Sequence, residues 1–183
     1  MLGGAAPSLL DTYEEERLPV AANVLGLSNK LYRQISGDED QMRRDAVTLQ
    51  LGITYKEMSL SKASGGTRLN LSSGDRAPDA TGLAGNGRPV RLFDFFRGPH
   101  FTLLRLFAGE GGEQFSNLKT VSVQHALSQG KAGAGVFVDA DGHVATTYGG
   151  GNGECVLVRP DGYIGWTGPQ TALADLRGYP GLR

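Results

Sequence analysis

Apolar and polar positions in the first third of the chain recur with helical spacing. Ser8 can cap a helix over residues 9–17, with Asp11 three residues further on. Pro19 suits the first turn of a second helix, and Gly37 suits its end. The apolar positions of this second helix fall on one face: Val20, Val24, Leu27, Leu31 and Ile35. The pattern predicts two consecutive helices, the second with an apolar face that needs a partner.

The pattern changes after Gly37. Residues 41–46 are compatible with a short helix, and the alternation of apolar residues over 49–55 predicts a half-buried strand. Residues 59–73 are rich in Ser, Gly, Lys and Thr, which is typical of a linker. We expect a helical segment over residues 1–58, the linker over 59–73 and a second unit over 74–183. Two helices and a strand cannot bury themselves, so the helical segment should pack on the rest of the chain, on a second subunit or on a domain outside this sequence.

The second unit shows strand and helix signals in alternation. The predicted elements are a short amphipathic turn or helix over 91–97, a buried strand over 102–107, strands over 121–125 and 135–138, a hairpin of 154–158 and 163–166, and a final helix over 171–176. Residues 139–148 could begin a helix capped by Asp141. In the hairpin turn, Pro160 fixes the chain and Gly162 accepts positive φ. This order predicts an α/β fold, a thioredoxin-like sandwich preceded by a helical segment.

Composition removes several classes of function. The formal net charge of -1 gives no broad electrostatic reason to expect nucleic acid or an anionic membrane as partner. The single cysteine, Cys155, excludes an intrachain disulfide, a CxxC pair and a cysteine-based metal site, and it favours a cytoplasmic location. The first residues do not resemble a signal peptide, and no apolar run approaches the roughly 20 residues of a membrane helix. We expect neither secretion nor membrane insertion.

Four segments resemble a known family in the family's own order. They are LLDTYEEERLPVA at 9–21, GDRAPD at 74–79, RLFD at 91–94 and LVRPDGYIGW at 157–166. The set is similar to the C-terminal region of FAD-dependent aromatic-ring hydroxylases of the phenol hydroxylase and polyketide hydroxylase type, with Leu18 in place of the commoner Arg. The resemblance implies a parent enzyme that uses NAD(P)H, FAD and oxygen to hydroxylate an aromatic ring, and a thioredoxin-like C-terminal domain.

The chemistry of that family has no complete set of residues in this sequence. No GxGxxG follows a strand, so we expect no flavin in the isolated chain and no hydroxylation by it. The position of a thioredoxin CxxC reads FAGEGG at 107–112, which predicts a redox-inactive scaffold. We therefore assign no catalytic, cofactor-binding or metal residues.

Several residues invite a functional interpretation that a structural one explains better. We expect Cys155 to be a small buried hydrophobe, and Tyr163 and Trp166 to pack in the hairpin. The glycines over 149–153 lack the Lys and Ser or Thr of a phosphate-binding loop. We expect no zinc site from the widely separated His100, His125 and His143. We expect a turn rather than a calcium loop at Asp139 and Asp141. We expect a solvated face from the charged run of Glu14, Glu15, Glu16 and Arg17.

Two hypotheses from different classes remain. The first is a C-terminal piece of an aromatic hydroxylase with a structural or oligomerisation role, whose partner is a second copy or an FAD-binding domain. The alternative is an autonomous, redox-inactive thioredoxin-like binding module. A degenerate peroxiredoxin is a third interpretation, because GDRAPD is also similar to the opening of that family.

Overall fold

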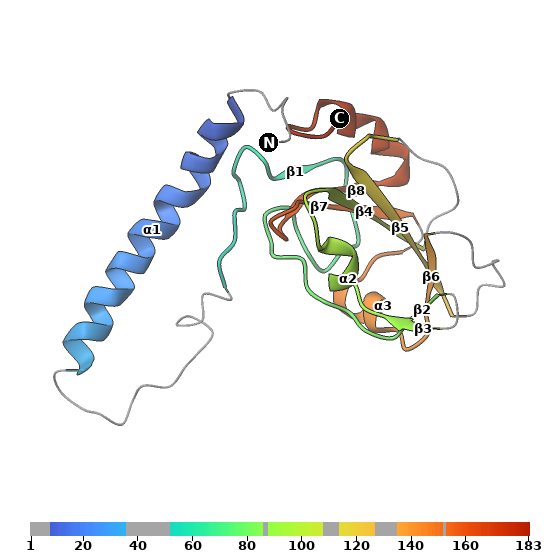
Figure 1. Cartoon of the computed structure of the whole chain (residues 1–183), viewed down its shortest axis with the longest axis horizontal. Coiled ribbons are helices and arrows are strands. Elements are labelled where there is room, and N and C mark those ends of the chain that lie inside the picture. The colour runs from blue at the N-terminus through green and yellow to red at the C-terminus, as the bar shows by residue number, and fades with distance from the viewer. Residues whose placement is uncertain (1–7, 36–51, 86–87, 108–113, 127–134, 152) are drawn as a thin grey trace.

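The computed structural model describes residues 8–35, 52–85, 88–107, 114–126, 135–151 and 153–183, and the side chains of the first helix from Leu9 to Gly26. One long helix stands beside a sheet domain, and only its N-terminal part approaches that domain (Figure 1). The predicted α/β class with an N-terminal helical segment is confirmed.

The first helix, α1, runs without interruption from Ser8 to Ile35 over 28 residues, with Pro19 inside it. The prediction of two helices separated at Pro19 is therefore wrong. Proline removes one backbone donor and crowds the preceding turn, which costs about 3 kcal/mol in a helix interior. The many good helix formers on both sides of Pro19 keep the helical path through this position.

The core of the second unit is a single eight-stranded mixed sheet with the order β1-β8-β7-β4-β5-β6-β2-β3. The strands are β1 (Lys62–Ala63), β2 (Leu83–Gly85), β3 (Arg88–Val90), β4 (Phe101–Leu106), β5 (Leu118–His125), β6 (Val136–Asp139), β7 (Glu154–Val158) and β8 (Ile164–Pro169). β4, β5 and β6 are parallel, whereas β7 runs antiparallel to β4 and β8 antiparallel to β7. The predicted central strand and hairpin are confirmed, and Gly162 in the hairpin turn has φ +86°.

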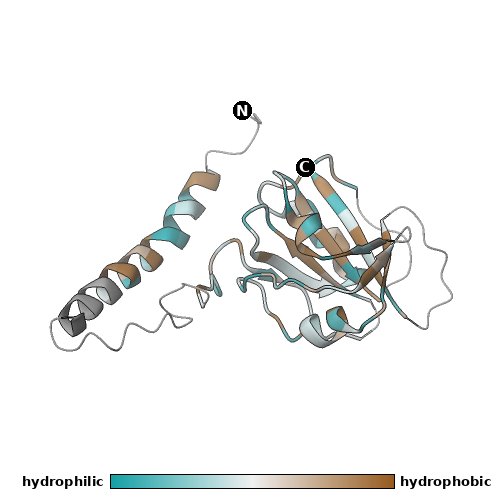
Figure 2. Ribbon diagram, turned by 60° about the horizontal axis from the view of Figure 1, so that its bottom comes forward, coloured by the Kyte–Doolittle hydropathy of each residue, from teal (hydrophilic) through white to brown (hydrophobic). Residues whose placement is uncertain are grey.

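Helices cover both faces of this sheet, so apolar side chains alternate between two cores (Figure 2). On one face, Leu104 and Leu106 of β4 pack with α2 (Phe93–Phe96) and α3 (His143–Tyr148). On the other face, Leu103 packs with the 3₁₀ helix η2 (Gln170–Gly178). The continuous apolar run of β4 thus follows from burial on both sides.

The segment before the sheet is closely bound to it. Tyr55 is buried and its backbone N–H donates to Gly74, while Ser64 donates to Thr167 beside the β1–β8 pairing. Residues 52–55 form turns and irregular chain rather than the expected strand, and residues 41–51 lie outside the described part. The predicted domain boundaries at 58 and 73 remain a prediction.

Candidate functional site

A buried polar cluster joins α1 to the turn between β7 and β8. Both terminal nitrogens of Arg159 donate to the Glu16 carboxylate, at 2.5 and 2.7 Å. One of them also donates to Asp161 at 2.5 Å. The Glu16 and Arg159 side chains are only 4% and 8% exposed. Two family-like segments at opposite ends of the sequence are thereby held together by a bidentate ion pair.

The electrostatics of this cluster favour full ionisation of Arg159. Burial by itself lowers the pKa of a guanidinium group, because it penalises the charge. Hydrogen bonds to Glu16 and the charge of Asp161 outweigh this effect, and the pKa of Arg159 lies above its ordinary value. Loss of one partner from such a buried pair costs about 3–5 kcal/mol, since the other charge is left uncompensated. The geometry therefore fixes where α1 meets the sheet domain.

Aromatic rings surround the ion pair. The guanidinium groups of Arg17 and Arg159 lie 5.8 and 5.9 Å from the Tyr55 ring centre, and Tyr163 packs on Tyr55 with ring centres 4.5 Å apart. Burial raises the pKa of Tyr55, although the positive charge of Arg17 opposes the rise. Glu15 adds a second tie from α1, because its carboxylate accepts from the backbone N–H of Ser59 at 3.0 Å and from the Ser59 hydroxyl.

Beside this cluster lies a pocket of about 360 Å³, between the first turns of α1 and the end of the chain. It is lined by Leu9, Thr12, Tyr13, Glu16, Arg17, Leu60, Pro99, Phe101, Asn117, Arg159, Pro160, Asp161, Tyr179, Pro180, Gly181 and Arg183. Two contacts hold parts of this lining together: the Tyr179 hydroxyl donates to Leu60 O at 2.7 Å, and Phe101 packs edge-on against Tyr179. We call this hollow the junction pocket.

The charged run at residues 14–17 of α1 was expected to form a solvated face. This expectation is wrong for one of its residues. Glu14 and Arg17 are exposed, whereas Glu16 is buried in the ion pair. Sequence reasoning missed the roles of Glu16 and Arg159. One signal was available, because both residues lie inside the family-like segments although neither belongs to an apolar pattern.

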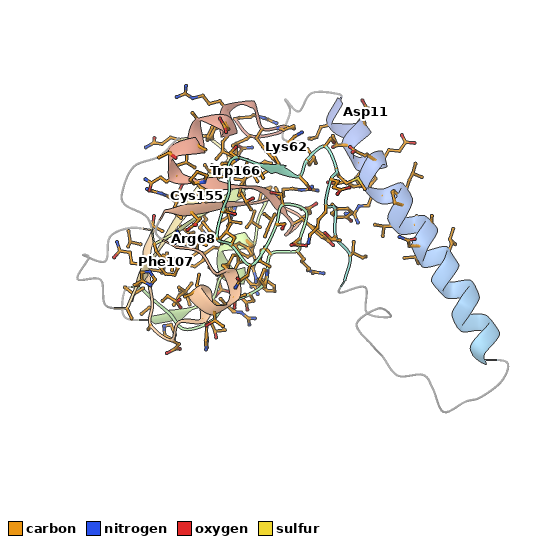
Figure 3. The ribbon with its side chains drawn as sticks, turned by 180° about the vertical axis from the view of Figure 1, so that it is seen from behind. Asp11, Lys62, Arg68, Phe107, Cys155 and Trp166 are labelled. Atoms are coloured by element: carbon orange, nitrogen blue, oxygen red, sulfur yellow. The ribbon has the colours of Figure 1, made fainter. Side chains whose placement is uncertain are left out.

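The hairpin residues behave as packing groups. Trp166 and Tyr163 are 2% and 8% exposed, and the Trp166 indole N–H donates to the Ser64 hydroxyl at 3.0 Å. Cys155 is fully buried in β7, and burial raises the pKa of its thiol to about 11, with Arg105 opposing the rise. Figure 3 shows Cys155 and Trp166 within the body of the sheet domain, away from Asp11 at the start of α1.

The three histidines and the two aspartates are not part of the lining of the junction pocket. No group of three or more metal-ligating side chains occurs among the described residues. The Asp139 carboxylate, at the end of β6, accepts from the backbone N–H groups of Val144 and Ala145. Asp139, rather than the predicted Asp141, therefore caps the start of α3. His125 stacks on Phe107 at the end of β4, with ring centres 3.7 Å apart. Residues 108–113, where a thioredoxin would carry its CxxC, lie outside the described part.

Comparison with known proteins identifies the family. Residues 71–179 match the model of the aromatic-ring hydroxylase C-terminal region. A flavin-dependent monooxygenase of Mycobacteroides abscessus is 42% identical over 88% of this chain and 28% of its own length. Pentachlorophenol 4-monooxygenase of Sphingobium chlorophenolicum is 32% identical over 88% of this chain and 34% of its own length. The chain belongs to the aromatic-ring hydroxylase family and spans about a third of the length of these relatives.

The fold agrees with this assignment. The crystal structure of the flavin-dependent monooxygenase PieE, in complex with FAD and substrate, matches 94% of this chain and 39% of its own chain with a TM-score of 0.66 at 20% identity. Because the sequences are only 20% identical, this similarity shows a shared fold and nothing more. None of the described helices is both long and apolar enough to cross a membrane.

Proposed function

We propose that this chain is the C-terminal part of an FAD- and NAD(P)H-dependent aromatic-ring monooxygenase and that its role there is structural. The observation that carries the proposal is the family match over residues 71–179 together with the Glu16–Arg159 pair, by which the matched domain holds the helix that resembles the end of the FAD-binding fold. In this role the domain positions α1 against a flavin-binding region or a second copy of the chain. The chain alone binds no flavin and hydroxylates no substrate.

We further propose that the sheet domain is a redox-inactive thioredoxin-like scaffold. The order β8-β7-β4-β5, with β4 parallel to β5 and antiparallel to β7, supports this assignment. The full burial of Cys155 and its raised thiol pKa also support it, since the thiolate is the reactive form. A cytoplasmic location is proposed from the sparse use of cysteine.

Reconstitution tests the structural role. The flavin-binding part of the Mycobacteroides abscessus relative, without the region that matches this chain, would be mixed with the 183-residue chain. Hydroxylation would be measured as product formed from a panel of phenols with NAD(P)H. We expect product only from the mixture, and less of it when Glu16→Gln replaces the wild-type chain.

Two results would contradict the proposal. The first is stoichiometric FAD in the purified chain alone, seen by its visible absorbance. The second is a flavin-binding part whose activity and stability do not change on addition of the chain. That second result would favour the autonomous binding module.

A further inference from the structure

The junction pocket has the features of a small-molecule site as well as those of a joint between two elements. Its volume of about 360 Å³ lies at the lower end of the range typical of ligand pockets, roughly 300–1,000 Å³. Such sites combine apolar walls with a few polar groups at fixed positions. The junction pocket has both kinds of lining.

The walls favour a flat apolar body. The rings of Phe101 and Tyr179 lie edge to face with centres 5.9 Å apart, and both side chains are less than a tenth exposed. Leu60 adds an aliphatic surface, and Leu9 on α1 adds another. Aromatic side chains of this kind contact a ring through edge-to-face or offset stacking. One or two fused rings fit a hollow of this size.

Two arginines of the lining, Arg159 and Arg17, differ in whether their guanidinium groups already have carboxylate partners. Arg159 already donates to two carboxylates, those of Glu16 and Asp161, so it offers little to an added anion. Arg17 differs, because within the described part of the chain its guanidinium group has ring contacts with Tyr13 and Tyr55 and no ion pair. Its planar donor fork matches a carboxylate in bidentate geometry.

The lining is also held in place without a ligand. The side chain of Asn117 donates to Gly181 O at 2.7 Å and accepts from the backbone N–H of Arg183 at 2.9 Å. These bonds fix the last residues of the chain against the start of β5. A pocket whose walls are fixed in advance loses less conformational entropy when it binds.

We propose that the junction pocket binds a small aromatic carboxylate, with the ring between Leu9, Phe101 and Tyr179 and the carboxylate on Arg17. The site lies between α1 and the C-terminal segment of the chain. Because residues of α1 and residues of the C-terminal segment both line the pocket, an occupant contacts both elements at once. Binding therefore stabilises the docked position of α1.

The test uses 2-naphthoate as the probe and isothermal titration calorimetry on the 183-residue chain. We expect saturable one-to-one binding, weakened at least fivefold by Arg17→Gln. The matched control is Arg97→Gln, which changes an exposed arginine at a different hollow and should leave binding unchanged. Neutral 2-naphthylmethanol should bind more weakly than 2-naphthoate, and equally to the wild-type chain and the Arg17→Gln variant.

A blocking variant gives an independent answer. Thr12→Phe places a ring in the pocket from an α1 position that is only partly buried, and circular dichroism checks that the chain still folds. We expect it to abolish binding. The proposal is overturned by an absence of saturable binding to the wild-type chain, by equal weakening in the two arginine variants, by undiminished binding to a folded Thr12→Phe chain, or by a neutral probe that binds as tightly as 2-naphthoate.

Discussion

Cys155 shows how environment decides the chemistry of a single residue. Its side chain lies among Leu103, Leu157 and Trp166 on the η2 face of the sheet. Burial raises the pKa of the thiol to about 11 from a reference of 9.0. At pH 8 the thiolate is therefore a minor species, and the core also excludes reagents. The sequence predicted this burial correctly, because an apolar strand context rarely holds an exposed cysteine.

The raised pKa of Cys155 predicts a pH dependence of stability. A group whose folded pKa lies above its unfolded pKa contributes stability that is complete below the unfolded value and is lost as pH rises. For Cys155 that loss falls between about pH 9 and 11. We expect the free energy of unfolding, measured in urea, to fall less steeply over this window in Cys155→Ala than in the wild-type chain. Parallel pH profiles for the two proteins would contradict the expectation.

Glu16 marks the limit of what could be predicted for single residues. Glu14, Glu15 and Glu16 are chemically alike and consecutive, so a periodic pattern does not tell which of them will be buried. The choice is made by the angle at which α1 docks and by the position of Arg159, which lies 143 residues away. Local pattern carries no information on such a distant pairing.

At the scale of elements, the docking of α1 depends on very few contacts. The described contacts between α1 and the sheet domain come from the N-terminal half of α1. The rest of the helix extends away from the domain (Figure 1). A helix that makes few tertiary contacts is marginal by itself, since most helical stability in proteins comes from packing. The stability of α1 should therefore respond strongly to the ion pair.

Hydrogen exchange tests this dependence. We expect Glu16→Gln to speed amide exchange over residues 9–20 by roughly 100-fold, because loss of one partner from a buried pair costs about 3 kcal/mol. Exchange in β4 should change little. The control is Glu14→Gln, which removes the same charge from an exposed position on the same helix. Equal acceleration in both variants would show that helix charge, rather than the pair, governs docking.

The elements also show which patterns can be interpreted from sequence and which cannot. The strand at 102–107 and the hairpin at 154–166 were predictable because burial on both faces produces continuous apolar runs. The single helix through Pro19 was not, because Pro favours the first turn of a helix and disfavours its interior, so the pattern predicts a new helix start there. Lys62 and Ala63 have no strand signal at all, and their pairing with β8 comes from tertiary contact alone.

At the scale of the whole molecule, α1 presents apolar side chains to solvent. Leu18 and Leu25 are 61% and 67% exposed, and their seven-residue spacing places them near the same face. Exposed apolar surface of this kind is typical of an interaction site. It supports the proposed docking on a second copy or on a flavin-binding region.

Sedimentation velocity measures this association directly. We expect the chain to sediment as a dimer or larger species at tens of micromolar, and the double variant Leu18→Ser, Leu25→Ser to sediment as a monomer. The control is Phe93→Ser, which removes an exposed apolar side chain from α2 and should leave the association unchanged. A wild-type chain that is monomeric throughout this range would leave the flavin-binding region as the partner of α1.

The two outermost strands of the sheet restrict how such an assembly can form. β1 contributes only two residues, one of them Lys62, and β3 contributes three, with Pro89 in the middle. Short edge strands with a charge or a proline offer too few backbone donors and acceptors for a strand of another molecule to align with them. Sheet extension from one copy to the next is therefore disfavoured at both edges. The proposed association between copies would therefore use side-chain surfaces, and the same short edges protect the domain from strand-by-strand aggregation.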